Sequence, residues 1–182
     1  MRVAVELAWL CPPSETAYSV GAVIVGADGT EVSRGYSREG GDPAVHAEES
    51  ALGKLAAGDP RLAGATIYST LEPCSQRQSR PCTCTQLIIA SGIRRVVIAW
   101  REPNLFVADC QGVELLTQAG LEVTELPSFA ARAAAPNRHL KVTLWDISDL
   151  PTIVPRHLLL TGRLGNHRAT GGKPRSRSMR RR

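Results

Sequence analysis

One stretch of the sequence combines residue types that hold a metal ion and move protons. His46 and Glu48 lie two residues apart, Cys74 follows 26 residues after Glu48, and Cys82 and Cys84 come soon after it. One imidazole and two thiolates suit zinc, and three protein ligands leave the fourth tetrahedral position open for water. Zinc lowers the pKa of such a water to about 7, and a nearby carboxylate can carry its protons. The pattern predicts a hydrolytic zinc site, with Glu48 as the catalytic residue.

The third metal ligand is either Cys82 or Cys84. Thr83 and Gln86 have the spacing of a capping box, which makes Cys84 the first residue of a helix. The helix dipole and the free amides stabilise a thiolate at that position. Cys82 falls outside this helix, so the pattern favours His46, Cys74 and Cys84 as ligands, with Cys82 as the alternative.

A closed structural zinc site is the competing interpretation of the same residues. Cys74, Cys82, Cys84 and His46 together would fill all four positions and leave none for water. Such a site would fit a non-catalytic, zinc-stabilised module that binds nucleic acid. Glu48 argues against it, because a structural site does not use a proton carrier.

The helix that carries His46 and Glu48 is expected to start close to them. Asp42 is a good N-cap and Pro43 suits the first helical position, so we predict a helix from Pro43 that ends before Gly58. In mid-helix, residues two apart point about 200° away from each other. Near the first turn, both side chains can reach a metal beyond the helix end.

The remaining pattern alternates strands with helices. We predict strands at residues 20–25, Glu31–Tyr36, 66–71, 95–100 and 121–126, and further helices at residues 3–10, Cys84–Ser91 and 112–119. Alternation of this kind predicts an α/β layered domain with a partly parallel sheet.

The 182 residues divide into a mildly acidic body and a basic tail. Thirteen Lys and Arg against 17 Asp and Glu give the first 149 residues a net charge of −4, whereas nine Lys and Arg and no acid follow. We predict one domain over residues 1–140 and an extension over residues 141–182 that is disordered from about residue 155. No aromatic residue lies from 151 onward to stack on bases, so we do not expect nucleic-acid binding.

Composition excludes a disordered or membrane-spanning chain. Hydrophobic residues make up 43% and charged residues 21%, which are globular values. The longest apolar runs are far shorter than the roughly 20 residues of a membrane helix. Glu6 interrupts the first apolar stretch and no small-residue cleavage site follows, so we expect a cytoplasmic protein.

These motifs resemble the zinc-dependent cytidine and deoxycytidylate deaminase superfamily, whose signature is H-x-E followed by P-C-x-x-C. The resemblance covers about residues 1–126. It implies a three-layer α/β/α sandwich around a five-stranded mixed sheet, with one zinc per chain on His46, Cys74 and Cys84. It also implies that Glu48 protonates a ring nitrogen and then the leaving amine, and that the chains form a homodimer or homotetramer.

The loop between the cysteines departs from the common signature. Nine residues separate Cys74 from Cys84, where the usual form has two. A longer loop is similar to the pyrimidine deaminases of riboflavin biosynthesis, which act on a diaminopyrimidinone ribosylamino phosphate. That branch implies a small aminopyrimidine nucleotide as substrate. A cytidine- or dCMP-type deaminase, or one for free cytosine or guanine, is the alternative.

Four further residues are candidates for contact with substrate. Arg77 and Arg80 lie in the loop between the cysteines, and guanidinium groups suit phosphate oxygens. Asn104 follows the fourth predicted strand, where parallel sheets place their ligands. Ser37 follows the second strand, where many cytidine and tRNA-adenosine deaminases have asparagine.

Overall fold

Five strands and five α-helices make up the described part of the chain, residues 1–103, 105–106 and 109–140, in a computed structural model. Asn104 and the predicted extension, residues 141–182, lie outside the described residues, so the predicted boundary at residue 140 stays a prediction. The elements are α1 (Arg2–Ala8), β1 (Gly21–Val25), β2 (Glu31–Tyr36), α2 (Ala47–Gly53), β3 (Thr66–Ser69), α3 (Cys84–Ser91), β4 (Arg95–Ile98), α4 (Gly112–Gln118), β5 (Glu122–Glu125) and α5 (Pro127–Ala134).

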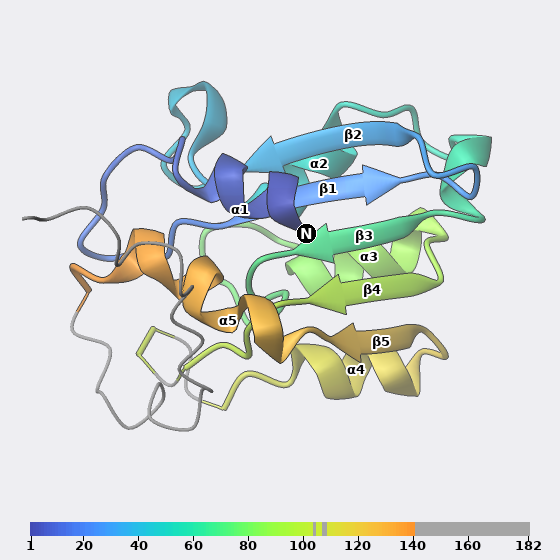
Figure 1. Cartoon of the computed structure of the whole chain (residues 1–182). Coiled ribbons are helices and arrows are strands. Elements are labelled where there is room, and N and C mark those ends of the chain that lie inside the picture. The colour runs from blue at the N-terminus through green and yellow to red at the C-terminus, as the bar shows by residue number, and fades with distance from the viewer. Residues whose placement is uncertain (104, 107–108, 141–182) are drawn as a thin grey trace, which may run out of the picture. The chain divides into compact units, whose positions relative to one another are not determined.

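The strands form one mixed sheet in the order β2-β1-β3-β4-β5. β1 is antiparallel to both of its neighbours, whereas β3, β4 and β5 run parallel to one another. The helices α2, α3 and α4 cover one face of the sheet, and α1 and α5 lie on the other (Figure 1). This arrangement confirms the predicted three-layer α/β/α sandwich with a five-stranded mixed sheet.

Alternation along β1 shows how the sheet separates the two layers. Val23 packs with Ala4 and Leu7 of α1 in a small apolar cluster. Its neighbour Ile24 is fully buried in the main core, which also contains Ala47 of α2. Successive side chains of a strand point to opposite faces, so one short strand anchors a helix on each side.

The start of α2 differs from the prediction. The sequence predicts a helix from Pro43 with Asp42 as its N-cap, but residues 43–46 are not helical and His46 is the N-cap of α2. The predicted start is therefore wrong by four residues. The helix also ends earlier than predicted, at Gly53 and not just before Gly58, but its position beside His46 and Glu48 is as expected.

Asp42, the predicted N-cap, stabilises a short turn and does not cap α2. Its side chain accepts a hydrogen bond from the amide of Ala44 at 2.9 Å, as in a local Asx turn. The carbonyl of Val45 is then taken by the amide of Arg38 at 2.8 Å, which draws the chain back toward β2. Because these groups are already paired, helical hydrogen bonds begin only after Val45.

A glycine sets how closely α2 approaches the sheet. A Cβ at Gly35 of β2 would lie 2.5 Å from the backbone nitrogen of Ala51 and 2.6 Å from the carbonyl oxygen of Ala47. Gly35→Ala is therefore expected to push α2 away and lower the free energy of unfolding by about 1–3 kcal/mol, measured by urea denaturation. Gly53→Ala is the control, because nothing lies within 4 Å of a Cβ at that end of α2. Equal stability of the two variants would contradict this packing.

No helix in the described residues is long and apolar enough to cross a membrane.

Candidate metal centre and active site

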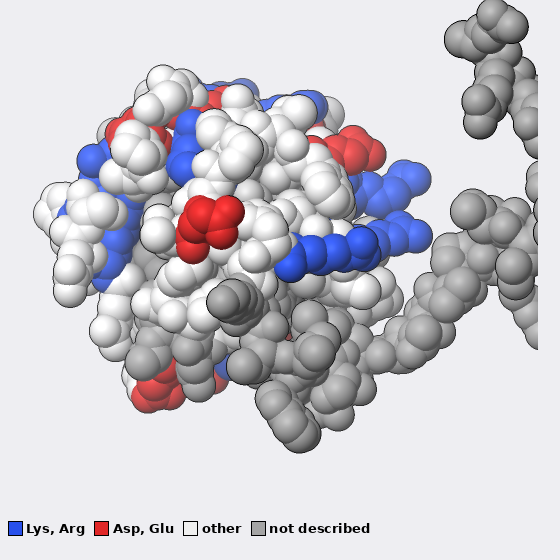
Figure 2. Space-filling model, turned by 90° about the vertical axis from the view of Figure 1, so that its left-hand side faces the viewer, with Lys and Arg blue, Asp and Glu red and all other residues white. Residues whose placement is uncertain are grey.

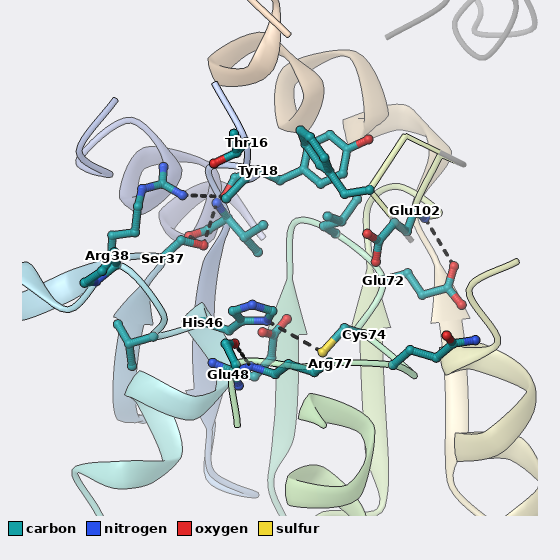
Figure 3. A pocket seen from close by; sticks show the side chains of 18 of the residues that line it. Thr16, Tyr18, Ser37, Arg38, His46, Glu48, Glu72, Cys74, Arg77 and Glu102 are labelled. Atoms are coloured by element: carbon teal, nitrogen blue, oxygen red, sulfur yellow. Dashed lines mark hydrogen bonds between the residues drawn. The ribbon is translucent and has the colours of Figure 1, made fainter. Parts of the chain in front are cut away.

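Three chain segments meet at one end of the sheet. His46 lies just before α2, Cys74 lies in the loop that follows β3, and Cys84 is the first residue of α3. Figure 3 shows His46 and Cys74 side by side with Glu48 next to them. The structure thus brings together all four residues that the sequence predicts for the metal site and its proton carrier.

The side-chain atoms of the cluster have the spacing of a tetrahedral zinc site. His46 Nδ1 lies 3.6 Å from Cys74 Sγ and 3.4 Å from Cys84 Sγ, and all three atoms lie within 4.8 Å of one another. Zinc–sulfur bonds of about 2.3 Å and zinc–nitrogen bonds of about 2.0 Å place N and S roughly 3.6 Å apart in a tetrahedron. The donor set and its spacing therefore fit zinc.

The second candidate cysteine lies outside this cluster. Cys84 is fully buried, whereas Cys82 is exposed and does not belong to the three-residue group. The geometry thus agrees with the choice of Cys84 made from the capping pattern. It does not assemble the four ligands that a closed structural site would need.

The start of α3 is built as its sequence predicts. Thr83 is the N-cap and its hydroxyl accepts from the amide of Gln86 at 3.2 Å, while the Gln86 side chain accepts from the amide of Thr83 at 2.9 Å. The hydroxyl of Thr85 donates to the carbonyls of Pro73 and Cys74 at 3.1 and 3.0 Å. The first turn of α3 therefore holds the Cys74 loop in place.

The protonation of the cluster reflects its close packing. A hydrogen bond from Cys84 lowers the pKa of the Cys74 thiol to about 4, whereas that same contact and burial raise the pKa of Cys84. Burial lowers the pKa of His46, but the hydrogen bond and charge of Cys74 outweigh it and leave a net rise. One thiolate is thus already favoured, which suits a metal that binds thiolates.

Glu48 is a buried carboxylate at the side of the cluster. Its residue is 3% exposed, and Oε1 accepts a hydrogen bond of 2.6 Å from the hydroxyl of Ser69. Burial raises the pKa of the Glu48 carboxyl above its ordinary value. Glu48 is therefore a carboxyl placed beside the cluster that could take up and return protons there.

The cluster opens into a cavity of about 520 Å³. His46, Glu48 and Cys74 form part of its lining (Figure 3). Tyr18 and Phe106 also line it, with ring centres 4.9 Å apart. This volume lies in the range of small-molecule sites, and the aromatic rings offer a wall for a flat heterocycle.

The four predicted substrate residues have different positions. Ser37 and Arg77 line the cavity, whereas Arg80 does not and Asn104 lies outside the described residues. The hydroxyl of Ser37 accepts a hydrogen bond of 3.2 Å from the amide of Val20, so it also holds the start of β1.

Arg80 is engaged at the surface. It pairs with Glu49 at 3.0 Å and with Asp42, and a third of its side chain is exposed. Its contact with substrate stays a prediction.

Arg38 and Glu102 are charged residues of the cavity that were not predicted from the sequence. Arg38 is 6% exposed, has a φ of 63°, and donates to the carbonyls of Pro12 and Tyr18, both at 2.9 Å. No local pattern marks it, because its partners lie 20 and 26 residues away in the chain. Glu102 also lines the cavity, and burial raises its pKa to about 7. Its position soon after β4 was the signal from which Glu102 could have been predicted as a cavity residue.

In the part of the chain that the structure describes, the surface at this end carries no single dominant charge. Figure 2 shows the side to which the arrowheads of β2, β3, β4 and β5 point in Figure 1, and acidic and basic side chains are scattered over its described part. A nucleic-acid interface would call for a continuous basic surface. This view therefore gives the nucleic-acid-binding alternative no support.

Comparisons with known proteins agree with the site. The chain is 45% identical over 131 residues to the diaminohydroxyphosphoribosylamino-pyrimidine deaminase of Schizosaccharomyces pombe, covering 71% of this chain and 32% of that protein. It is 48% identical over 105 residues to the riboflavin biosynthesis protein RibD of Aquifex aeolicus, covering 58% of this chain and 27% of that protein. The chain thus spans about a third or less of the length of these curated relatives.

Solved structures show the same relationship in three dimensions. Acinetobacter baumannii RibD superimposes with a TM-score of 0.62 at 33% identity, covering 75% of this chain and 36% of that one. Aspergillus oryzae Rib2 deaminase, a C-terminal deletion mutant, gives 0.60 at 27% identity, covering 74% of this chain and 89% of that one. Residues 1–100 match the family described as the cytidine and deoxycytidylate deaminase zinc-binding region. The chain, with its cluster of His46, Cys74 and Cys84 and the buried Glu48 beside it, belongs to this zinc-binding deaminase family.

Proposed function

We propose that this chain is a zinc-dependent deaminase that removes an exocyclic amine, as ammonia, from the diaminopyrimidinone ribosylamino phosphate of riboflavin biosynthesis. The observation that carries the proposal is the three-ligand cluster beside a buried carboxylate in a cavity of about 520 Å³. The Schizosaccharomyces pombe relative, named for this deaminase activity, supports the choice of substrate.

In this proposal His46, Cys74 and Cys84 hold one zinc ion per chain. When bound, zinc supplies a water molecule acidic enough to act as a nucleophile at neutral pH. The cavity walls hold the heterocycle with its amine-bearing carbon toward the cluster and exclude other water.

Glu48 carries the protons of the reaction. Its carboxylate takes a proton from the attacking water and passes it to the ring nitrogen beside the amine-bearing carbon. It then moves the second proton of that water to the amine, the carbon–nitrogen bond breaks, and ammonia leaves behind a ring carbonyl. The raised pKa of Glu48 suits a group that must accept and return protons in each cycle.

A panel assay tests the substrate. The purified full chain, with its metal content measured, is given the diaminopyrimidinone phosphate, dCMP, cytidine, cytosine and guanine in separate reactions, and ammonia release is followed. The proposal expects turnover of the first compound alone or far above the others. Turnover of one of the others without the first would make this a cytidine-type or free-base deaminase, and no turnover by zinc-loaded protein would overturn the enzyme proposal.

We further propose that Arg77 binds the substrate phosphate. Its side chain is 2% exposed and lines the cavity, and among the described residues its Nη1 has no hydrogen-bond partner. Nη2 pairs with Glu49 at 2.7 Å and Nε donates to Ser79 at 3.0 Å, so the guanidinium is fixed while Nη1 keeps its donors. A buried donor without a partner is costly, and a phosphate oxygen would satisfy it.

Replacing Arg77 is expected to weaken binding of the phosphorylated substrate. Arg77→Met should raise KM by about 10- to 100-fold, as expected for a lost hydrogen bond between charged groups. The dephosphorylated nucleoside should show a much smaller change. Arg80→Met is the matched control, because Arg80 also pairs with Glu49 but does not line the cavity. An equal loss for both substrates would remove Arg77 from phosphate binding.

Three smaller points complete the proposal. We expect one zinc ion per chain by metal analysis, a homodimer or homotetramer by light scattering, and a cytoplasmic location by cell fractionation.

A further inference from the structure

The proton carrier Glu48 is held by a residue that the proposed mechanism does not use. The hydroxyl of Ser69 donates to Glu48 Oε1 at 2.6 Å, and Ser69 is fully buried at the end of β3. A short hydrogen bond to a carboxylate is among the stronger kinds in proteins. It joins the central strand of the sheet directly to α2.

Ser69 lies between two apolar residues of the neighbouring strands. Its partners in the sheet register are Ala22 of β1 and Ile98 of β4, and both of these are fully buried. An unpaired hydroxyl in such a place would cost stability, and an alanine or valine would pack there without that cost. We therefore attribute the presence of a hydroxyl at this position to its hydrogen bond with Glu48.

The chemistry at Glu48 depends on where its oxygens point. The terminal torsion of a glutamate is broad, so packing alone leaves the carboxylate free to rotate. A hydrogen bond at Oε1 from a rigid strand fixes the plane of the group. Misplacement of a reacting group by about 1 Å can cost 10²-fold in rate.

We propose that Ser69 is a positioning residue that holds the Glu48 carboxylate in its proton-transfer orientation. The inference rests on the proposed function of Glu48. It makes β3 contribute to the site twice: through the loop that carries Cys74 and through the hydroxyl that orients the proton carrier.

A second strand serine provides a matched control. Ser33 of β2 is 9% exposed, and its hydroxyl donates to the carbonyl of Ala51 in α2 at 2.7 Å. Both serines therefore tie a strand to α2 through one hydroxyl, but only Ser69 bonds to Glu48. Ser33→Ala removes the same kind of contact at a place away from the proposed chemistry.

The test compares Ser69→Ala, Ser69→Thr and Ser33→Ala in the full-length, zinc-loaded protein. We expect Ser69→Ala to lower kcat by about 10- to 100-fold, with KM within about twofold and zinc content unchanged. Ser69→Thr keeps the hydroxyl and should recover most of kcat. Ser33→Ala should lose thermal stability like Ser69→Ala but keep kcat.

The outcomes separate this inference from the proposed function. Wild-type kcat in Ser69→Ala, or equal losses of kcat in Ser69→Ala and Ser33→Ala, would overturn the positioning role while deamination itself stands. Failure of Ser69→Thr to recover kcat, when it folds and holds zinc, would also count against it. A wild-type protein that releases no ammonia from any compound in the panel would overturn the proposed function and, with it, the role of Ser69.

Discussion

Replacing Glu48 with glutamine is expected to lower kcat by about 10²- to 10⁴-fold while bound zinc is retained. Glutamine has nearly the same shape as glutamate and can still accept the Ser69 hydrogen bond, so the cavity keeps its form. The amide cannot accept and return protons, which is the work that we assign to Glu48. The proposed metal ligands are other residues, His46, Cys74 and Cys84, so metal analysis should show the wild-type zinc content.

The same substitution should leave the protein as stable as the wild type or more stable. Burial raises the pKa of the Glu48 carboxyl in the folded protein above its ordinary value of 4.5. The stability of the folded state therefore falls as pH rises from 4.5 toward the raised pKa, because the folded state holds its proton more tightly than the unfolded state does. At pH 7 the neutral amide removes this cost. Thermal unfolding of zinc-free Glu48→Gln and zinc-free wild type at pH 5 and pH 7 measures this gain in stability, which should be larger at pH 7.

A second buried glutamate shows what a structural carboxylate looks like. Glu72 is also 3% exposed, but its oxygens accept hydrogen bonds from the amides of Val113 at 2.9 Å and Glu102 at 3.2 Å. Glu72→Gln would place an amide group against an N–H donor, so it should lower stability. Wild-type turnover in Glu48→Gln, or loss of zinc from it, would contradict the role proposed for Glu48.

Much of the site was predictable because its signals are local. Thr83 and Gln86 form a capping box within four residues of sequence, and this placed Cys84 at the start of a helix as the structure has it. For His46 and Glu48 to reach the same metal, the prediction required only that a helix start close to them. The strands were found from their apolar runs, and the five-stranded mixed sheet between helices followed from the family resemblance.

The parts that sequence reasoning missed depend on contacts between distant residues. Asp42 has the character of a helix cap, yet the bond between Arg38 and Val45 commits the following residues to a turn. In the sequence, Ser69 has no feature that distinguishes it from other strand residues. Its hydrogen bond to Glu48 of α2, 21 residues away, exists only in the folded structure. The Arg38 guanidinium is held in place by hydrogen bonds to carbonyls of the segment before β1. Local patterns carry no information about such partners.

Replacing Cys84 is expected to abolish zinc binding, whereas replacing Cys82 is expected to preserve it. Changes to residues that merely support metal ligands cost about 10- to 100-fold in metal affinity, so loss of a ligand should cost more than about 100-fold. Cys84 is fully buried at the start of α3 beside His46, so the position left by its removal has no nearby substitute: Cys82 is exposed and lies outside the cluster.

The measurement is zinc content after dialysis against a chelator, together with thermal unfolding with and without added zinc. Wild type and Cys82→Ala should keep their zinc and gain stability from it, because a metal that binds only the folded state stabilises that state. Cys84→Ala should hold no zinc, gain no stability from added zinc and release no ammonia. Zinc loss in Cys82→Ala would instead point to the closed four-ligand site. Since such a site leaves no position for water, that result would remove the basis for hydrolysis along with the ligand assignment.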